Sequence, residues 1–358
     1  MPVDLSVVIC AFNGAPGVRR CLTALGTQTI RARMEIIVVD DGSADDTSEV
    51  ARAHGAVIVR HPENRGIAAA RNSGVRAASA PIVAFLDDDC EPEPQWAERL
   101  LACYGEDVMG VGGPLLPEAR PGFMLGYLKR HNPLDPLELN LANSDNLLYR
   151  FFLYLRRQWA PVRARGARAV YSLAGANMSF RRSAVIAVGN FDERFRFGAE
   201  EVDLCQRMVR AFPGDRLLFI PEARVVHHFE PTVRDTLRRS RAYGRGSARL
   251  YRKWPLLSPT FFPGPVAVAG MLALCTRFPE LLVAPAIMPQ LLYPQGPRDA
   301  VTRRRLTCLL DSYVQLAQEA CEDVGFIEGM WRFRHLVPEP RNAPVRGAES
   351  SWAPEPGP

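Results

Sequence analysis

Short apolar runs alternate with helical patterns through the first third of the chain, and this alternation limits the possible folds more than any other feature. Five runs rich in valine, isoleucine and leucine are typical of strands: 5–10, 35–40, 56–60, 82–86 and 108–113. The four segments between them are typical of helices: 18–25, 43–54, 67–78 and 96–104. Four strand–helix repeats predict an α/β fold with a doubly wound, mostly parallel sheet.

The bulk composition is that of an ordinary globular protein. The chain has 358 residues, 47% hydrophobic and 23% charged, which is enough for two or three structural units. Its eight cysteines form no C-x-x-C pair, which argues against a zinc or disulfide framework and for a reducing compartment. Residues 1–4 start no basic or apolar leader. We therefore expect a cytoplasmic protein, and we expect no nucleic-acid partner.

Three consecutive acids end the fourth predicted strand. Asp87, Asp88 and Asp89 follow the apolar run 82–86 directly. Adjacent carboxylates repel one another, so a buried strand end gains nothing from them unless a cation is present. Mg²⁺ and Mn²⁺ prefer oxygen ligands and commonly bind few carboxylates together with substrate phosphates. The stretch predicts either a divalent-metal site or a solvated junction between strand and loop.

Other polar side chains also follow strands of the predicted sheet. Asp40 ends the second strand, and Asn64, Arg65 and Arg71 follow the third. Parallel sheets of this kind bind ligands at the carboxyl ends of their strands, so we expect these side chains and the acids to share one ligand site. A nicotinamide-type site is disfavoured, because residues 11–17 lack the G-x-G-x-x-G spacing that it requires.

Taken in order, the motifs resemble a known family. LSVVICAFNG, EIIVVDDGSADDT, NRGIAAARNSG and FLDDDCEPEPQW look like the N-terminal half of bacterial family 2 glycosyltransferases. Four later segments continue the family's order as far as residue 230: 174–182, 189–194, 199–205 and 221–228. The resemblance implies a GT-A fold, with a Rossmann-like, doubly wound and mostly parallel sheet, followed here by a C-terminal helical extension.

On the donor side, the resemblance implies a nucleotide-diphosphate sugar, usually a UDP-sugar. Asp40 would pair with the base, and Arg71 would support the nucleotide. Asn64 and Asn177 lie within family motifs and are assigned to the substrate site as well.

The metal, Mg²⁺ or Mn²⁺, would be held by the two acids of a D-x-D motif, Asp87 and Asp89, with Asp89 on the ion. Asp88 would be the variable middle residue, placed in the substrate site. His227 would approach the same metal; it follows the apolar run 217–226, which is predicted as one late strand. The alternative for His227 is an ordinary hydrogen bond at a strand end, because imidazole is a less usual partner for Mg²⁺.

The acid pair of the family's Glu-Asp motif falls on Glu200 and Glu201. Glu201 takes the place of the aspartate that serves as general base, and Glu200 is assigned to the substrate site. This is a departure from the family pattern, since glutamate is one methylene longer. From the residues alone, 200–209 is also typical of the charged start of a surface helix.

The prediction divides the chain into four parts. Residues 1–113 form a nucleotide-sugar-binding half, 114–235 an acceptor-binding half, 236–338 a helical extension with membrane-interfacial contact, and 339–358 a disordered tail. An aromatic and basic segment, 151–168, is inserted in the second half. It would either pack on the catalytic domain or meet a lipid-linked acceptor or an anionic membrane.

Within the extension, helices are expected at 238–252 and 303–330. The uncharged run 254–276 contains four prolines, and its helical remainder is too short to span a bilayer, which needs about 20 residues. Pro285 and Pro289 are expected to interrupt the next apolar run.

These features together predict an inverting, metal-dependent glycosyltransferase. It would move a sugar from a nucleotide-diphosphate donor to a hydroxyl of a glycan or lipid-linked acceptor, with peripheral contact at the cytoplasmic face of a membrane. A non-catalytic nucleotide- or carbohydrate-binding module is the alternative, because position 201 departs from the family. A nucleotidyltransferase normally needs an early glycine-rich basic loop, and residues 11–17 contain no base.

Overall fold

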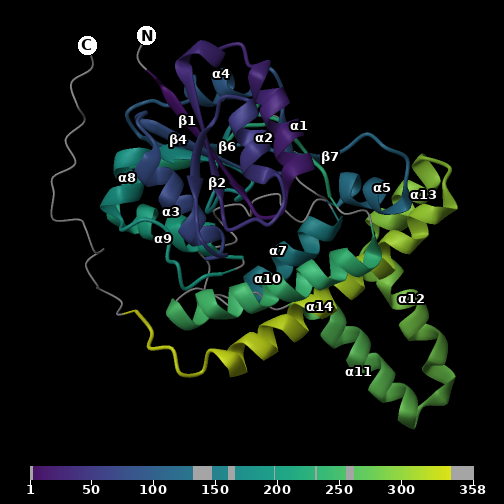
Figure 1. Cartoon of the computed structure of the whole chain (residues 1–358). Helices are drawn as coiled ribbons and strands as arrows, with labels where there is room; N and C mark the ends of the chain where they lie inside the picture. The colour runs from purple at the N-terminus through teal and green to yellow at the C-terminus, as the bar shows by residue number, and fades with distance from the viewer. Residues whose placement is uncertain are drawn as a thin grey trace.

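The computed structural model describes residues 3–131, 147–159, 166–196, 198–229, 232–254 and 262–339. Within these, one eight-stranded sheet has the strand order β3-β2-β1-β4-β9-β6-β10-β8, and a three-stranded sheet has the order β5-β11-β7. A helical layer lies beside the sheet domain (Figure 1). Strands from both sides of residue 113 interleave in the large sheet, so the two predicted halves share it.

The first four strands are parallel neighbours, as the sequence pattern predicts. They are β1 (Leu5–Ala11), β2 (Met34–Asp40), β3 (Val57–Arg60) and β4 (Ile82–Asp87). The remaining strands of the large sheet are β6 (Val108–Gly112), β8 (Arg168–Ala169), β9 (Asn177–Arg181) and β10 (Arg216–Phe219). β9 runs antiparallel between β4 and β6, so β6 is not the direct neighbour of the fourth strand. The sheet is therefore mostly parallel, as expected.

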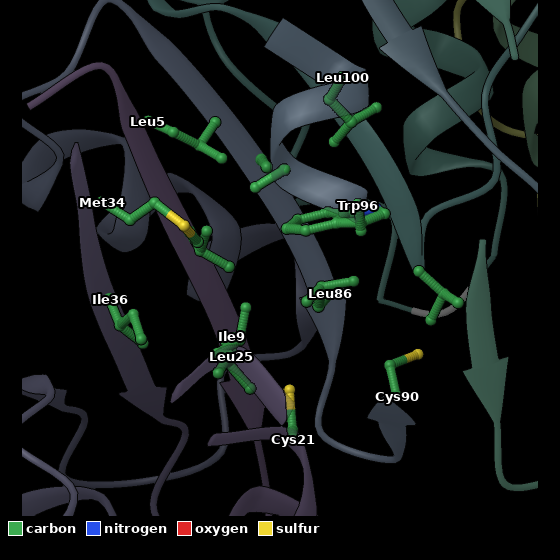
Figure 2. Close-up of a cluster of buried hydrophobic side chains, with 14 of the residues drawn as sticks. Leu5, Ile9, Cys21, Leu25, Met34, Ile36, Leu86, Cys90, Trp96 and Leu100 are labelled. Carbon is green, nitrogen blue, oxygen red and sulfur yellow. The ribbon is translucent and has the colours of Figure 1, made fainter. Parts of the chain in front are cut away.

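Helices cover both faces of the large sheet. One face packs against α1 (Ala15–Gly26), α2 (Thr47–Ala53) and α4 (Trp96–Leu101). Figure 2 shows this core, with Trp96 and Leu100 against Leu86 and Ile9. The opposite face packs against α3 (Ile67–Ala77), α8 (Arg182–Ala187) and α9 (Glu200–Ala211). Burial on both sides explains why the central strands are continuous apolar runs.

The small sheet corrects one expectation. The run 217–226 is not one strand: it divides into β10 and β11 (Val225–His227), which belong to different sheets. Pro221 lies between them and has no amide hydrogen to continue a strand ladder. β11 pairs with β5 (Cys90–Pro92) and with β7 (Leu115–Pro117).

The remaining helices form the helical layer. They are α5 (Phe123–Arg130), α7 (Leu147–Trp159), α10 (Val233–Lys253), α11 (Pro263–Arg277), α12 (Val283–Leu292), α13 (Gln295–Thr302) and α14 (Asp311–Arg332), with short 3₁₀ turns at Pro279–Leu282 and Leu306–Leu310. A third 3₁₀ turn, Arg31–Arg33, precedes β2 in the sheet domain. α14 starts later than the predicted 303, because the 3₁₀ turn precedes it. Pro289 lies inside α12, so it does not end that helix. The tail from 340 lies outside the described residues, as do Arg163 and Arg165.

Glycines allow α10 and α14 to pack closely along their length (Figure 1). A Cβ added at Gly244 would lie 1.9 Å from the carbonyl oxygen of Glu322, and one at Gly325 would lie 2.0 Å from that of Arg241. Both neighbours are backbone atoms that a side-chain rotation cannot move. The two helices are thus matched by shape at these positions.

Gly244→Ala is expected to lower the free energy of unfolding by about 1–3 kcal/mol, the usual effect of overpacking, as measured by urea denaturation. Gly270→Ala in α11 is the matched control, because a Cβ there meets nothing within 4 Å. The control should be neutral or slightly stabilising, since alanine is the better helix former. Equal effects of the two changes would contradict the packing argument.

Candidate active site

Strand pairing brings together acids and a histidine that are far apart in sequence. The β5–β11 pair places His227 opposite Cys90, and the amide of His228 donates to the carbonyl of Asp89 at 3.0 Å. His227 Nε2 then lies 3.4 Å from Asp89 Oδ1. The sequence prediction placed both residues on one metal, and the structure does bring them together.

Among the described residues, one group of side chains has the spacing of a metal site. Ligand atoms of Asp89, Cys90 and His227 all lie within 4.8 Å of one another. His227 is buried, and its Nδ1 has no hydrogen-bond partner among the described residues. Burial raises the pKa of Asp89, and the electrostatic interaction with His227 opposes that rise. A divalent cation fits this arrangement, because it would satisfy a carboxylate and an imidazole that are otherwise poorly paired.

The other two acids of the triplet face different neighbours. Asp87 Oδ1 lies 3.4 Å from the guanidinium of Arg71, and Asp87 is not part of the three-residue group. The Asp88 side chain turns toward the start of α1, where a Cβ at Gly14 would come within 1.8 Å of its Oδ2. Burial, followed by the charges of Asp89 and Asp87, raises the pKa of Asp88 to about 8. Three carboxylates this close do repel one another, as the sequence suggested.

Arg71 connects the acids of β4 to the glutamates of α9. It is buried, and its guanidinium contacts Asp87 and also Glu200 Oε1, the latter at 2.5 Å. Burial and the negative charge of Glu200 raise the pKa of Glu201 well above the ordinary range of a glutamate, against the opposing charge of Arg71. Glu200 is thus committed to an ion pair, whereas Glu201 is the carboxyl with raised basicity and partial exposure. The role of Glu201 as a proton acceptor stays a prediction.

The backbone before α9 is held in an unusual conformation. Gly198 and Ala199 have φ angles of +76° and +69°. A left-handed alanine is uncommon and costs about 1–2 kcal/mol, so the surrounding structure must impose it. This turn places Glu200 and Glu201 in the first turn of α9. The surface-helix interpretation is therefore correct about the helix, but Glu200 is buried rather than solvated.

Asp40, the predicted partner of the nucleotide base, has no surface available in this structure. Asp40 is 0% exposed, and it accepts hydrogen bonds from the amide of Ser43 at 2.8 Å and from the hydroxyl of Ser48. Its pairing with a base stays a prediction, and it would require one of these bonds to open. Asn64, by contrast, is exposed in the loop before α3.

The assignment of Asn177 to the substrate site needs correction. Its side chain is 0% exposed, donates to the carbonyls of Pro114 and Ala223, and accepts from the indole of Trp96. All of its hydrogen-bonding capacity except one acceptor position is used internally. Asn177 is a structural link between the two sheets, and its place in a family motif has a folding reason.

Sequence reasoning missed two residues on α10 that interact electrostatically with the acids. Arg239 lowers the pKa of Asp89 electrostatically. Burial raises the pKa of Tyr243 to about 12, with further contributions from the charges of Glu201 and Asp87. Arg239 and Tyr243 are four residues apart and share one helix face. The basic character of this helix was visible in the sequence, but the face directed at the site was not.

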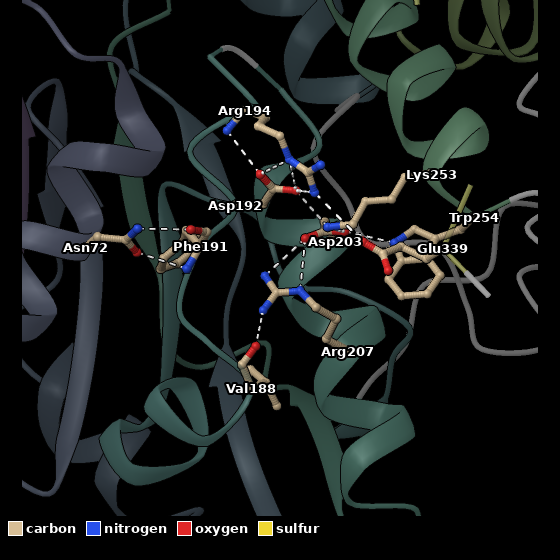
Figure 3. A network of polar contacts seen from close by, with 10 residues as sticks. All are labelled: Asn72, Val188, Phe191, Asp192, Arg194, Asp203, Arg207, Lys253, Trp254 and Glu339. Atoms are coloured by element: carbon tan, nitrogen blue, oxygen red, sulfur yellow. Dashed lines mark hydrogen bonds and ion pairs between the residues drawn. The ribbon is translucent and has the colours of Figure 1, made fainter. Parts of the chain in front are cut away.

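Figure 3 shows a polar network that fastens α9 to the end of α10. Lys253 Nζ lies 2.7 Å from Asp192 Oδ2 and 2.7 Å from Asp203 Oδ1. Arg207 also binds Asp203 at 3.0 Å, and the Trp254 indole donates to Asp203 at 2.8 Å. Lys253 is only 8% exposed. The network couples the helical layer to the helix that carries Glu200 and Glu201.

Lys253→Met is expected to lower the free energy of unfolding by about 3 kcal/mol, because it removes one partner from buried ion pairs. Burial alone would raise the pKa of Asp192, but bonds from Arg194 and Lys253 outweigh this and lower it. Because the pKa of Asp192 is lower in the folded state, its ion pairs stabilise the protein fully at pH values above the unfolded pKa of 3.8. This stabilisation is lost as the pH falls through the folded-state pKa. The gap between wild type and variant should therefore narrow in acid.

Urea denaturation at several pH values measures that gap. Lys129→Met is the control, because Lys129 is the other lysine of the chain and is exposed. A gap that stays constant from neutral pH to below pH 3 would argue against the ion pairs as its cause.

Comparison with known proteins shows which family the chain belongs to. A family model described as "Glycosyl transferase family 2" matches residues 6–121, and one described as "Glycosyl transferase family group 2" matches residues 140–294. Pre-mycofactocin glycosyltransferase of Mycobacterium tuberculosis is 33% identical over 255 residues, which cover 70% of this chain and 48% of that protein. Glycosyltransferase AglE of Haloferax volcanii is 40% identical over 116 residues, which cover 30% of this chain and 38% of that protein.

Among solved structures, the mannosyltransferase PcManGT from Pyrobaculum calidifontis in complex with GDP-Man and Mn²⁺ is similar at a TM-score of 0.56. Its sequence identity is 17%, and the match covers 93% of this chain and 88% of that one. This likeness, together with the mostly parallel sheet, defines a GT-A glycosyltransferase fold. By its family matches and relatives, the chain belongs to glycosyltransferase family 2. The matched part of the chain spans about half the length of the first relative, 48%, and 38% of the second.

Proposed function

We propose that this protein is an inverting glycosyltransferase that transfers a sugar from a nucleotide-diphosphate donor to an acceptor hydroxyl. The observation that carries the proposal is the position of Arg71, which contacts Asp87 on β4 and Glu200 on α9. It joins Asp87, beside the proposed cation site, to Glu200, the chain neighbour of Glu201, which is the glutamate suited to activate an acceptor. A UDP-sugar is the proposed donor.

On the donor side, Asp89 and His227 would hold a divalent cation, Mg²⁺ or Mn²⁺, with Asp87 beside them. Such an ion neutralises charge on the departing nucleoside diphosphate. Arg239, facing Asp89 from α10, is placed to add positive charge there. A crystal complex of PcManGT contains Mn²⁺ with GDP-Man, which supports the choice of ligand class.

On the acceptor side, Glu201 would take the proton of the attacking hydroxyl. A weak nucleophile needs such a base, and a carboxyl with raised pKa is better matched to the task than an ordinary one. The longer glutamate side chain would reach an acceptor further from the α9 backbone than the family's aspartate does. Attack from the side opposite the leaving group inverts the sugar's configuration.

The acceptor proposed is a glycan or a lipid-linked saccharide, with peripheral contact to a membrane. A non-catalytic binding module on the same scaffold is the second candidate. It is less favoured, because a module would not need a carboxyl whose pKa is raised beside a committed ion pair.

A donor screen tests the proposed function. Purified protein is incubated with UDP- and GDP-sugars, and the nucleoside diphosphate released by slow hydrolysis is measured with and without chelator. The expected result is metal-dependent release from one donor class, most strongly UDP-sugars. Tight donor binding without any release, also in the presence of glycan acceptors, would indicate the binding module instead.

A further inference from the structure

A hairpin of two apolar helices projects from the helical layer, at the lower right of Figure 1. It consists of α11, a 3₁₀ turn and α12, residues 263–292, and is called the arm below. Large apolar side chains are exposed along the whole arm: Leu272 on α11 is 52% exposed, Leu282 in the 3₁₀ turn is 63% exposed, and Leu291 on α12 is 63% exposed. The buried residues of α11 are Gly264 and Cys275, and α12 buries Pro289.

This exposure differs from that of an ordinary surface helix, which turns a polar face to water. The arm contains one cation and one acid, Arg277 and Glu280, and both lie at the bend between its helices. Neighbouring exposed apolar side chains of this kind on a monomer mark a site of interaction. Because the apolar side chains are distributed around the helices, their surroundings must be apolar on more than one side.

The arm is fixed to the body at its base. A Cβ at Gly264 would come within 2.0 Å of the Tyr293 hydroxyl, which shows how tightly α11 meets the end of α12 there. Tyr313 donates to the carbonyl of Ala286 at 2.7 Å, and Gln290 donates to the carbonyl of Leu309 at 2.7 Å. These contacts hold α12 against the start of α14, so the arm is an ordered projection.

Basic and apolar residues also lie between α13 and the 3₁₀ turn Leu306–Leu310, and this turn contacts α12 through Leu309 and Gln290. Arg303, Arg304 and Arg305 are all exposed, and they are followed by Leu306, which is 80% exposed. Arg303 pairs with Asp299 at 3.4 Å, while no acid of the described chain lies within 4 Å of the other two guanidinium groups. Arginines beside exposed leucines complement an anionic lipid surface, where headgroup phosphates lie next to acyl chains.

The lengths of the helices indicate whether the arm spans a bilayer or lies in its surface. None of the described helices is both long and apolar enough to cross a membrane. The 15 residues of α11 extend about 22 Å, less than the roughly 30 Å of a hydrocarbon core. Entry with the bend first would carry Arg277 and Glu280 into that core, which is unfavourable. An orientation along the interface leaves both charges at headgroup depth.

We propose that residues 263–292 are a membrane anchor that lies in the interfacial layer of an anionic bilayer, with Arg303–Arg305 on the lipid phosphates. The inference deepens the peripheral contact proposed above by assigning it to one element. It does not depend on the donor chemistry, because no residue of the arm is near the site residues in sequence or shares an element with them.

Flotation of the full chain with vesicles tests the anchor. Wild type is expected to float with phosphatidylglycerol–phosphatidylcholine vesicles. Leu282→Ser with Ile287→Ser removes two exposed side chains of the arm and should weaken partition by about tenfold for each. Val57→Ser with Ile186→Ser is the matched control, because these side chains are 51% and 44% exposed elsewhere. The control should float like wild type.

A second pair of variants tests the contribution of charge to membrane binding. Arg304→Gln with Arg305→Gln should weaken binding to phosphatidylglycerol vesicles by about fivefold per arginine, and should change binding to pure phosphatidylcholine far less. Arg52→Gln, an exposed arginine of α2, is the control. Metal-dependent donor hydrolysis in solution should be unchanged in every arm variant, so failure of the anchor and failure of the transferase proposal are distinguishable.

Three outcomes would overturn the anchor. The first is that wild type stays in the lipid-free fraction. The second is that Val57→Ser with Ile186→Ser loses binding as strongly as Leu282→Ser with Ile287→Ser. The third is a dimer in sedimentation that does not bind vesicles and that Leu282→Ser with Ile287→Ser converts to a monomer. That result would assign the arm to a second copy of the chain.

Discussion

Glu201→Gln is expected to bind the donor normally and to lower the turnover number by about 10²–10⁴-fold. Glutamine keeps the shape and hydrogen-bonding capacity of the side chain but cannot accept a proton. Because the loss falls on the chemical step, kcat should decrease without a matching change in donor affinity. Stopped assays of sugar transfer, with donor binding measured separately by calorimetry, check both parts.

The pH profile provides a second readout for Glu201. Burial and the charge of Glu200 raise the pKa of Glu201. A base is active when deprotonated, so the acidic limb of the kcat profile should lie at higher pH than for an ordinary glutamate, whose pKa is about 4.5. In Glu201→Gln this limb should disappear along with most of the activity.

Glu200→Gln and Asp203→Asn are the neighbouring comparisons. Glu200→Gln breaks the ion pair with Arg71 and should lower stability and donor affinity. Asp203 lies in the network with Lys253, so its change should act on stability first. If Glu200→Gln abolishes the chemical step while Glu201→Gln transfers sugar at nearly the normal rate, the base is Glu200.

Asp89→Ala is expected to weaken metal-dependent donor binding by at least about 100-fold. Loss of a residue that only supports a metal ligand already costs about 10–100-fold in affinity, so loss of a direct ligand should cost no less. His227→Ala should act in the same direction, because His227 Nε2 lies beside Asp89. Calorimetry with UDP and Mn²⁺ measures the effect.

Asp46→Ala is the control for Asp89→Ala. Asp46 is an exposed aspartate at the start of α2, and its side chain makes no capping hydrogen bond. Its replacement should leave binding unchanged. Full turnover by Asp89→Ala in the presence of chelator would remove Asp89 from the metal site.

The strand–helix alternation of the first 113 residues was sufficient to predict the parallel half of the sheet. Local apolar runs determine β1 to β4, and their order follows from right-handed, short connections. The antiparallel insertion of β9 between β4 and β6 was not predictable in this way, since it pairs residues far apart in sequence, such as Leu86 with Asn177 and Gly110 with Phe180. The split of 217–226 between two sheets has the same origin, with Pro221 as the local signal that was overlooked.

The candidate site shows a similar limit. The three acids and Arg71 could be grouped from strand ends alone, and the family motifs added His227 and the glutamates. Burial could not be inferred: Asn177 has the sequence context of a ligand residue, yet its side chain is buried and hydrogen-bonded to Trp96 and two carbonyls. Arg239 and Tyr243 were missed because helical periodicity does not indicate which tertiary neighbour a face meets.

The most direct test of the central claim is calorimetric titration of the wild-type protein with UDP, first with Mn²⁺ and then with chelator. We predict that UDP binds only when the cation is present. Asp46→Ala should retain this binding, and Asp89→Ala should lose it. Equal affinity for UDP with and without the cation would contradict a metal-dependent nucleotide site formed by Asp87, Asp89 and His227.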